Sequence, residues 1–180
     1  MRVFRFVLGG GIGLATLLGV VVAPAYAAQP VPHRFIFMSD VCDPTTFNAM
    51  FGPGTCVRSG PGVPLNTFVK QLQLLHFVPG WLFAPQVVVA STTDPIEVKN
   101  IGGELHTFTE VEHFGGGFVP LLNQLGGTPV PAPECSPTPG KDNTFVPAGT
   151  SFTFTEDEVG THLYQCCIHP WMHETLTVRP

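Results

Sequence analysis

Basic side chains are scarce in this 180-residue chain, which has 8 lysines and arginines against 13 acidic residues. The acidic residues are scattered, and the absence of a basic stripe leaves nucleic-acid binding without electrostatic support. Internal repeats and coiled-coil heptads are also lacking, which excludes solenoid and long-helix architectures. The chain has instead 20 glycines, 19 prolines and many short β-branched and aromatic runs. That composition favours a loop-rich, all-β sandwich.

The first 27 residues have the pattern of a secretory signal peptide. Arg2 and Arg5 precede an apolar stretch from Phe6 to Ala23, and Ala25-Tyr26-Ala27 places small residues before a cleavage point at Ala28. We therefore expect an exported, periplasmic or extracellular protein with no stable membrane span after cleavage. The alternative is an uncleaved anchor, because the apolar stretch is borderline in length for a membrane span.

The mature chain, residues 28–180, is long enough for one compact domain with a proper core. Its net charge is −7 once the two arginines of the leader are removed from the count. Residues 28–80 read as an N-terminal extension with a possible edge strand at 33–37 and a turn-rich stretch behind it. Apolar residues at helical spacing then predict one short helix over 65–77, with Asn66 as its cap.

From Trp81 onward the pattern changes to short strands, so that residues 81–180 form a second part. About seven or eight strands are expected in all. Those of the second part are placed at 86–90, 95–99, 105–111, 144–146, 151–155, 161–166 and 175–179. A loop rich in glycine and proline, residues 114–141, interrupts them and includes a helical turn at 119–125.

Near the C-terminus a thiol, an imidazole and a thioether stand three residues apart, at Cys166, His169 and Met172. Soft sulfur donors with imidazole suit copper, and two histidines, one cysteine and a weak axial methionine are the ligands of a blue-copper electron-transfer site. The second histidine must come from upstream. His106 is the candidate, because it shares the inward face of its strand with Phe108. Taken alone, His106 is better interpreted as a hydrogen-bonded core histidine. The alternative to a copper site is that His169 and Met172 simply fill a core.

The loop Cys-x-x-His-Pro-x-Met resembles the copper-binding loop of the cupredoxins, in the short form found in amicyanin-like and plastocyanin-like proteins. The resemblance covers roughly residues 83–178. It implies a Greek-key β-sandwich that holds one Cu(I)/Cu(II) ion. The ligands that it implies are His106, Cys166, His169 and Met172.

The same resemblance implies roles for residues around the ligands. Asn100 and Thr107 hold the positions of an asparagine and a polar residue that brace the site in that family. Pro170 fixes the backbone after His169. His169 itself is expected to face the surface as the electron exit, with Trp171 packed over the loop or lining the docking patch.

Five cysteines in an exported protein is an odd number that calls for a reason. One thiolate for copper and two disulfides account for all five. Cys42 and Cys56 lie in the turn-rich stretch and are expected to pair, which stabilises by about 3 kcal/mol in the chain-entropy model. Cys135 and Cys167 are then the second pair, and Cys166 stays free.

The function expected from these residues is that of a monomeric one-electron carrier between redox protein partners. It is not expected to be an enzyme, because multicopper oxidases need His-x-His pairs and further domains. A copper-binding module for storage, delivery or sensing is the alternative, although the mature chain has only three methionines. A secreted interaction domain whose degenerate loop binds nothing is another. Entry of Cys167 or His173 into the coordination sphere is expected to give a green or red site rather than a blue one, or a site that holds copper without fast electron transfer.

Overall fold

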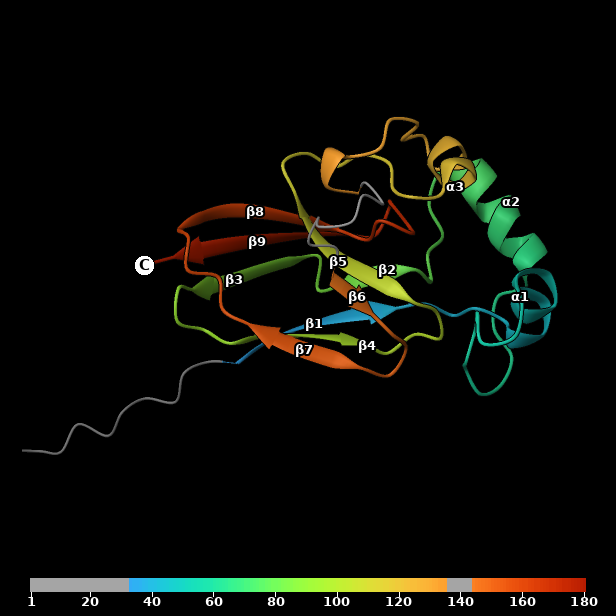
Figure 1. The fold of residues 1–180 in the computed structure, drawn as a ribbon, viewed down its shortest axis with the longest axis horizontal. Helices are drawn as coiled ribbons and strands as arrows, with labels where there is room; N and C mark the ends of the chain where they lie inside the picture. The colour runs from blue at the N-terminus through green and yellow to red at the C-terminus, as the bar shows by residue number, and fades with distance from the viewer. Residues whose placement is uncertain (1–32, 136–143) are drawn as a thin grey trace, which may run out of the picture. The chain divides into compact units, whose positions relative to one another are not determined.

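The computed structural model describes residues 33–135 and 144–180, which belong to one compact unit. The predicted leader, residues 1–27, lies outside the described residues. Two β-sheets form a sandwich, and helices lie at one end of it (Figure 1). The predicted β-sandwich is therefore confirmed. The described residues form nine strands, one or two more than the sequence predicts.

The first sheet has four strands in the order β2-β1-β4-β7. They are β1 (Arg34–Ser39), β2 (Leu82–Ala84), β4 (Ile96–Asn100) and β7 (Ser151–Phe154). β1 pairs with β2 on one side and, in parallel, with β4 on the other. It is an inner strand, so the predicted edge position is wrong. Its inward side chains Ile36 and Met38 are fully buried, as on any strand with one face on the core, so their pattern did not distinguish an inner strand from an edge strand.

The second sheet has five strands in the order β3-β9-β8-β5-β6. They are β3 (Val87–Ser91), β5 (His106–Val111), β6 (Thr144–Val146), β8 (Gly160–Gln165) and β9 (His173–Arg179). Only β3 and β9 pair in parallel. In the antiparallel pair of β5 and β8, Thr109 lies opposite Gln165. This register brings the start of β5 next to the loop that follows β8.

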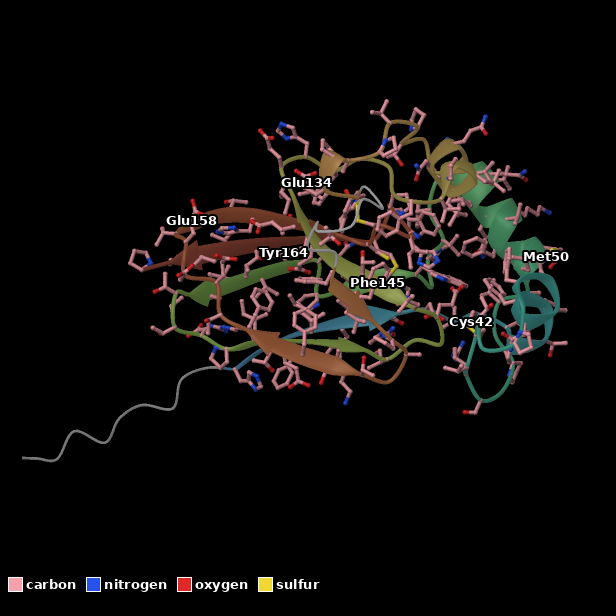
Figure 2. All side chains as sticks on the ribbon, in the orientation of Figure 1. Cys42, Met50, Glu134, Phe145, Glu158 and Tyr164 are labelled. Carbon is pink, nitrogen blue, oxygen red and sulfur yellow. A yellow bond between two sulfur atoms is a disulfide. The ribbon has the colours of Figure 1, made fainter. Side chains whose placement is uncertain are left out.

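Aromatic rings fill the space between the two sheets. Phe108 of β5 stacks on Tyr164 of β8 with ring centroids 4.3 Å apart, and Tyr164 points into that space (Figure 2). From the four-stranded sheet, Phe83 and Phe152 approach Phe108 to 5.6 and 6.2 Å. Burial of such rings is the main favourable term for packing one sheet on the other.

The helices are α1 (Pro44–Phe51), α2 (Leu65–Leu75), α3 (Pro120–Leu125) and the 3-10 turn η1 (Pro133–Cys135). α2 is the helix expected over 65–77, and α3 is the helical turn expected at 119–125. Asn66 does not cap α2, because the helix begins one residue earlier, and the Leu65 N–H donates to the hydroxyl of Thr46 instead.

The extension holds two helices, so the prediction of a single helix is wrong. Asp43 caps α1 by accepting a hydrogen bond from the Thr46 N–H at 2.9 Å, and Pro44 occupies the first turn. An aspartate followed by proline is a helix start that the sequence displays. The glycines near this helix start favoured an irregular loop instead, so the sequence did not predict α1.

The first two helices pack through an aromatic cluster at the end of the sandwich. Phe68 of α2 lies 4.8 Å from Trp81 and 5.6 Å from Phe47 of α1. It also lies 5.9 Å from Trp171. The helices are thus anchored to the loop that carries the candidate ligands. Within the described ranges, no helix has the length and apolar character of a membrane span.

Replacement of Phe108 by alanine tests the packing of the sandwich. Phe108 is 3% exposed, so Phe108→Ala is expected to lower the free energy of unfolding by about 3–5 kcal/mol. Urea denaturation with both disulfides intact measures it. Phe145→Ala on the neighbouring strand β6 is the control, because that side chain is 53% exposed. Equal losses from the two variants would contradict the packing described.

Candidate metal centre

Three ligand atoms from two separate parts of the chain converge on one point. The Cys166 sulfur lies 3.7 Å from His106 Nδ1 and 3.8 Å from His169 Nδ1, and the two nitrogens lie 3.3 Å apart. His106 begins β5, and the other two belong to the loop between β8 and β9. All three side chains are buried. The structure thus brings together the two histidines and the cysteine predicted from the sequence.

The size of this triangle fits a metal ion. Metal bonds of about 2.0 Å to nitrogen and about 2.3 Å to sulfur are usual for imidazole and thiolate. In a trigonal plane they place two nitrogens about 3.5 Å apart, and a nitrogen and a sulfur about 3.7 Å apart. The observed separations agree with these values to a few tenths of an ångström. Two imidazoles and one thiolate are also the donor set that suits copper.

Backbone hydrogen bonds close the loop around the sulfur. The Cys166 N–H donates to the Met172 carbonyl at 3.1 Å, and the Met172 N–H donates to the His169 carbonyl at 2.9 Å. The sulfur itself accepts from the N–H groups of Thr107 and His169 at 3.4 and 3.5 Å. Donors aimed at sulfur stabilise a thiolate. Met172 is fully buried in this loop, and its role as axial ligand stays a prediction.

The charges of the site favour a thiolate. Burial alone would raise the pKa of Cys166, but hydrogen bonds and charge from His106 and His169 hold it well below its usual value. Burial alone would lower the pKa of His106, but Asp40 and Cys166 raise it to about 9. The thiolate is the form of cysteine that binds metals.

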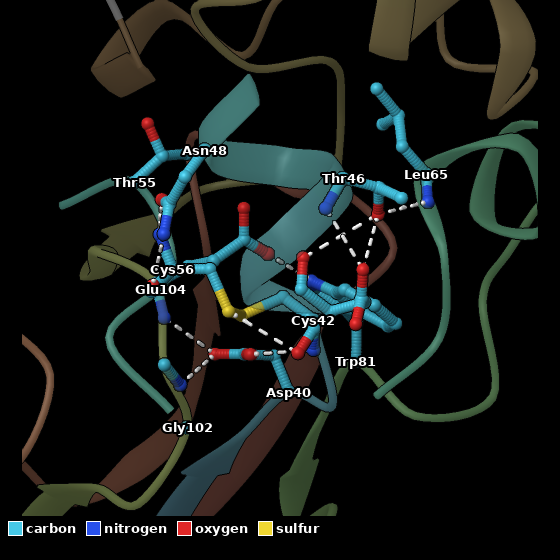
Figure 3. The surroundings of a disulfide bond; sticks show 12 residues. Asp40, Cys42, Thr46, Asn48, Thr55, Cys56, Leu65, Trp81, Gly102 and Glu104 are labelled. Atoms are coloured by element: carbon cyan, nitrogen blue, oxygen red, sulfur yellow. Dashed lines mark hydrogen bonds between the residues drawn. A yellow bond between two sulfur atoms is a disulfide. The ribbon is translucent and has the colours of Figure 1, made fainter. Parts of the chain in front are cut away.

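Asp40 is a site residue that the sequence did not reveal. Its carboxylate oxygen lies 3.0 Å from His106 Nε2, on the opposite side of the ring from Cys166, and both side chains are fully buried. Figure 3 shows Asp40 beside the Cys42–Cys56 disulfide, facing the loop at Gly102. Burial raises the pKa of Asp40, but the hydrogen bond from His106 and those from the loop N–H groups lower it to about 2. No sequence motif near residue 40 indicates this contact with His106.

Glu104 is a second buried carboxylate near the ligands. Its Oε2 accepts a hydrogen bond of 2.6 Å from the Trp81 indole and lies 3.7 Å from His169 Nε2. Burial raises its pKa, against the opposing charge of His169 and the indole hydrogen bond. Both candidate histidines therefore have a carboxylate on the side away from the sulfur.

Asn100 and Thr107 hold the strands around the site. The Asn100 side chain donates to the carbonyls of Glu104 and Val146, both at 2.8 Å, and is fully buried. The Thr107 hydroxyl accepts from the Cys167 N–H at 2.7 Å. The Asn100 bonds join β4 to the loop before β5 and to β6, and the Thr107 bond joins β5 to the cysteine loop. Such contacts orient ligands.

Both predicted disulfides are present, between Cys42 and Cys56 and between Cys135 and Cys167. Cys166 is the free cysteine. The Cys167 sulfur is thereby engaged and does not compete for a metal. The ring of His173 stacks on Phe114 with centroids 3.9 Å apart.

His169 does not face the surface, so the expectation of an exposed electron exit is wrong. Its residue exposure is 3%, because the loop lies under the helical end of the molecule. Pro170 is buried as well, and Trp171 is half-buried. The Trp171 ring meets that of His169 edge-on at 5.6 Å and lies 5.9 Å from Phe68 of α2. The helix that covers this loop lies far from it in sequence, so the residues of the loop gave no sign that His169 would be buried.

Two further clusters of metal-binding residue types occur in the described part of the chain. Asp40 and Glu104 gather with Cys42, but that sulfur belongs to a disulfide. Glu110 and Glu156 gather around His162, whose two ring nitrogens already lie 2.8 Å from Glu110 and 2.9 Å from the Glu158 carbonyl. The triangle around Cys166 is therefore the cluster best suited to a metal.

Comparison with known proteins finds no matching family model and no match among curated sequences. Among solved structures, the chain is similar to a novel purple cupredoxin from Nitrosopumilus maritimus, at 12% identity over 81% of this chain and 99% of that one, with a TM-score of 0.44. It is also similar to amicyanin from Paracoccus versutus, at 15% identity over 57% and 76% of the two chains, with a TM-score of 0.36.

A third similar structure is a copper-containing nitrite reductase from Thermus scotoductus, at 17% identity over 56% of this chain, with a TM-score of 0.38. The match spans about a fifth of that enzyme, 21% of its chain. The assignment of a metal site to this chain rests on its own geometry at His106, Cys166 and His169.

A thiol count tests the cysteine assignment. The unreduced protein, unfolded in guanidinium, is expected to release one thiol per chain, because four of its five cysteines are in disulfides. Reaction with a chromogenic disulfide reagent measures it. Cys166→Ser should release none. A free thiol remaining in Cys166→Ser would show that the adjacent cysteines are paired differently.

Proposed function

We propose that this protein is an exported type 1 copper protein that carries single electrons between redox proteins as a monomer. The observation that supports the proposal is the buried triangle of His106 Nδ1, Cys166 Sγ and His169 Nδ1, whose sides match a trigonal metal site. Met172 is the proposed axial ligand, and one copper ion is the proposed cofactor. A thiolate and two imidazoles in one plane are acceptable to both oxidation states of copper.

The bound ion supplies one-electron oxidation and reduction, and the chain supplies a rigid, dry site. Cys166 provides the thiolate, held by two backbone N–H groups. His106 is fixed within a paired strand, and Thr107 ties that strand to the cysteine loop. Because these contacts involve buried groups, ligand movement between oxidation states is small. Burial of the ligands also excludes water from the sulfur.

Trp171 is the proposed electron exit. The His169 ring is buried, so no imidazole edge reaches a partner directly. The half-buried Trp171 ring contacts that imidazole edge-on and is adjacent to the helical end of the molecule. A redox partner is therefore proposed to approach over Trp171.

A copper-binding module with slow electron transfer is the second candidate. The observation that favours it is the burial of His169 at 3% exposure, which lengthens the path from the metal to a partner. The sequence argues against storage, since only Met38, Met50 and Met172 follow the leader. Both candidates predict copper binding and differ in the rate of electron exchange.

Titration with Cu(II) tests the copper site. One equivalent per chain is expected to produce an intense visible band from the Cys166 thiolate, and Cys166→Ser is expected to lose that band. Absorption and electron paramagnetic resonance spectra measure it. His113→Gln is the matched control, because the His113 side chain is 86% exposed and outside the triangle. A colourless wild-type protein, or a band that survives in Cys166→Ser, contradicts the proposal.

Electron self-exchange separates the two candidates. A carrier is expected to broaden the proton resonances of mixed Cu(I) and Cu(II) protein, and Trp171→Leu is expected to slow the exchange without shifting the visible band. Nuclear magnetic resonance line widths measure the rate. Leu121→Ala, at an exposed position of α3, is the control. Immeasurably slow exchange in the wild type favours the binding module instead.

A further inference from the structure

The Asp40 carboxylate is surrounded by hydrogen-bond donors. Its Oδ2 lies 2.8 Å from the Gly103 N–H and 2.9 Å from the Glu104 N–H, and it lies 3.0 Å from His106 Nε2. Its Oδ1 accepts from the Cys42 N–H at 3.2 Å. An ionised carboxylate only accepts hydrogen bonds, so His106 Nε2 must be the donor. The lone pair of the neutral ring then lies on Nδ1, which faces Cys166.

The loop between β4 and β5 is shaped to meet this carboxylate. A Cβ atom on Gly102 would collide with the Asp40 side chain, so only glycine permits this approach. Asp40 follows β1 directly, and Cys42 two residues later is tied to Cys56. Strand pairing on one side and a disulfide on the other therefore fix the carboxylate against the imidazole.

Glu104 repeats the arrangement for the other histidine at a longer distance. Its Oε2 lies 3.7 Å from His169 Nε2 and is held by the indole of Trp81. Trp81 is buried in the aromatic cluster of the helical end. Both imidazoles thus have a carboxylate behind them, in a part of the molecule from which water is excluded.

Negative charge held near a metal ion stabilises its more highly charged state. Coulomb attraction is strengthened in a low-dielectric interior, and Cu(II) carries one more positive charge than Cu(I). A carboxylate that accepts from a ligand histidine also raises the basicity of that ligand. The expected result is a lower reduction potential than the same triangle would have without the carboxylates.

We propose that Asp40 and Glu104 are positioning residues of the copper site. Asp40 sets the tautomer and orientation of His106, and the two carboxylates together favour Cu(II) over Cu(I). The proposal rests on the function proposed above. It assigns a redox role to the N-terminal part of the chain, which supplies Asp40 directly after β1.

Asp40→Asn and Glu104→Gln test the proposal through the reduction potential of the copper-loaded protein. Loss of the Asp40 charge is expected to lower the ratio of Cu(II) to Cu(I) affinity about tenfold, which is a rise of about 59 mV for one electron. Glu104→Gln is expected to raise the potential by less, since its carboxylate does not reach hydrogen-bond distance of His169. Redox titration followed at the visible band measures both.

Two controls separate the effect of the Asp40 charge on the reduction potential from the effect of a general loss of structure. Asp94→Asn removes another buried carboxylate, which pairs with Arg34 at the start of β1, and it is expected to leave the potential unchanged. Asp40→Glu retains the charge and is expected to recover most of the wild-type potential. A rise in Asp40→Glu equal to that in Asp40→Asn shows a structural cause and overturns the proposal.

The outcomes distinguish this inference from the proposed function. A wild-type protein without the visible band overturns the copper function and this inference together. A wild-type protein that has the band, with an unchanged potential in Asp40→Asn, overturns the inference alone. If Asp40→Asn does not fold, Glu104→Gln decides, because an unchanged potential in that variant also overturns the proposal.

Discussion

Antiparallel pairing of β5 with β8 is the constraint on which the candidate site depends. It places residues 60 positions apart in sequence, His106 and Cys166, within 3.7 Å of each other. The Thr107 hydroxyl, bonded to the Cys167 N–H, extends that contact beyond the last ladder pair. Because strand register is set by which side chains are buried, the aromatic core at Phe108 also sets the geometry of the triangle.

The site is enclosed from two directions. The sandwich supplies His106 and the cysteine loop, whereas α2 covers the loop through the contact of Phe68 with Trp171. Enclosure strengthens every electrostatic interaction among the buried groups. It also buries His169, so the proposed electron transfer would pass through the neighbouring ring of Trp171. Burial that makes the site rigid would thus lengthen the path to a proposed redox partner.

The N-terminal extension does more than cover the candidate site. β1 lies inside the four-stranded sheet, and the residue that follows it, Asp40, has a carboxylate that reaches His106. The Cys42–Cys56 disulfide closes the segment that carries α1 directly behind this carboxylate. The first part of the described chain is therefore built into the chemistry of the site, and a fold of residues 81–180 alone would lack one strand and one buried charge.

Local patterns in the sequence were sufficient for several elements. Alternating apolar residues predicted most strands, and helical spacing predicted α2 to within two residues of its end. The loop Cys166-x-x-His169 predicted two members of the triangle because its donor types suit one kind of metal. α1 was missed, although Asp43-Pro44 is a helix start, because glycine and proline around it favoured an irregular loop.

By itself, the sequence determined the β-sandwich and the donor types, because strand periodicity and residue chemistry are local properties. The cysteine pairs followed from the odd count once one thiolate was reserved for copper. Tertiary structure alone decided the burial of His169, the inner position of β1 and the contact of Asp40 with His106. Each of these depends on which distant segments pack together. The 66 positions between Asp40 and His106 carry no spacing rule, so only the folded chain could reveal that contact.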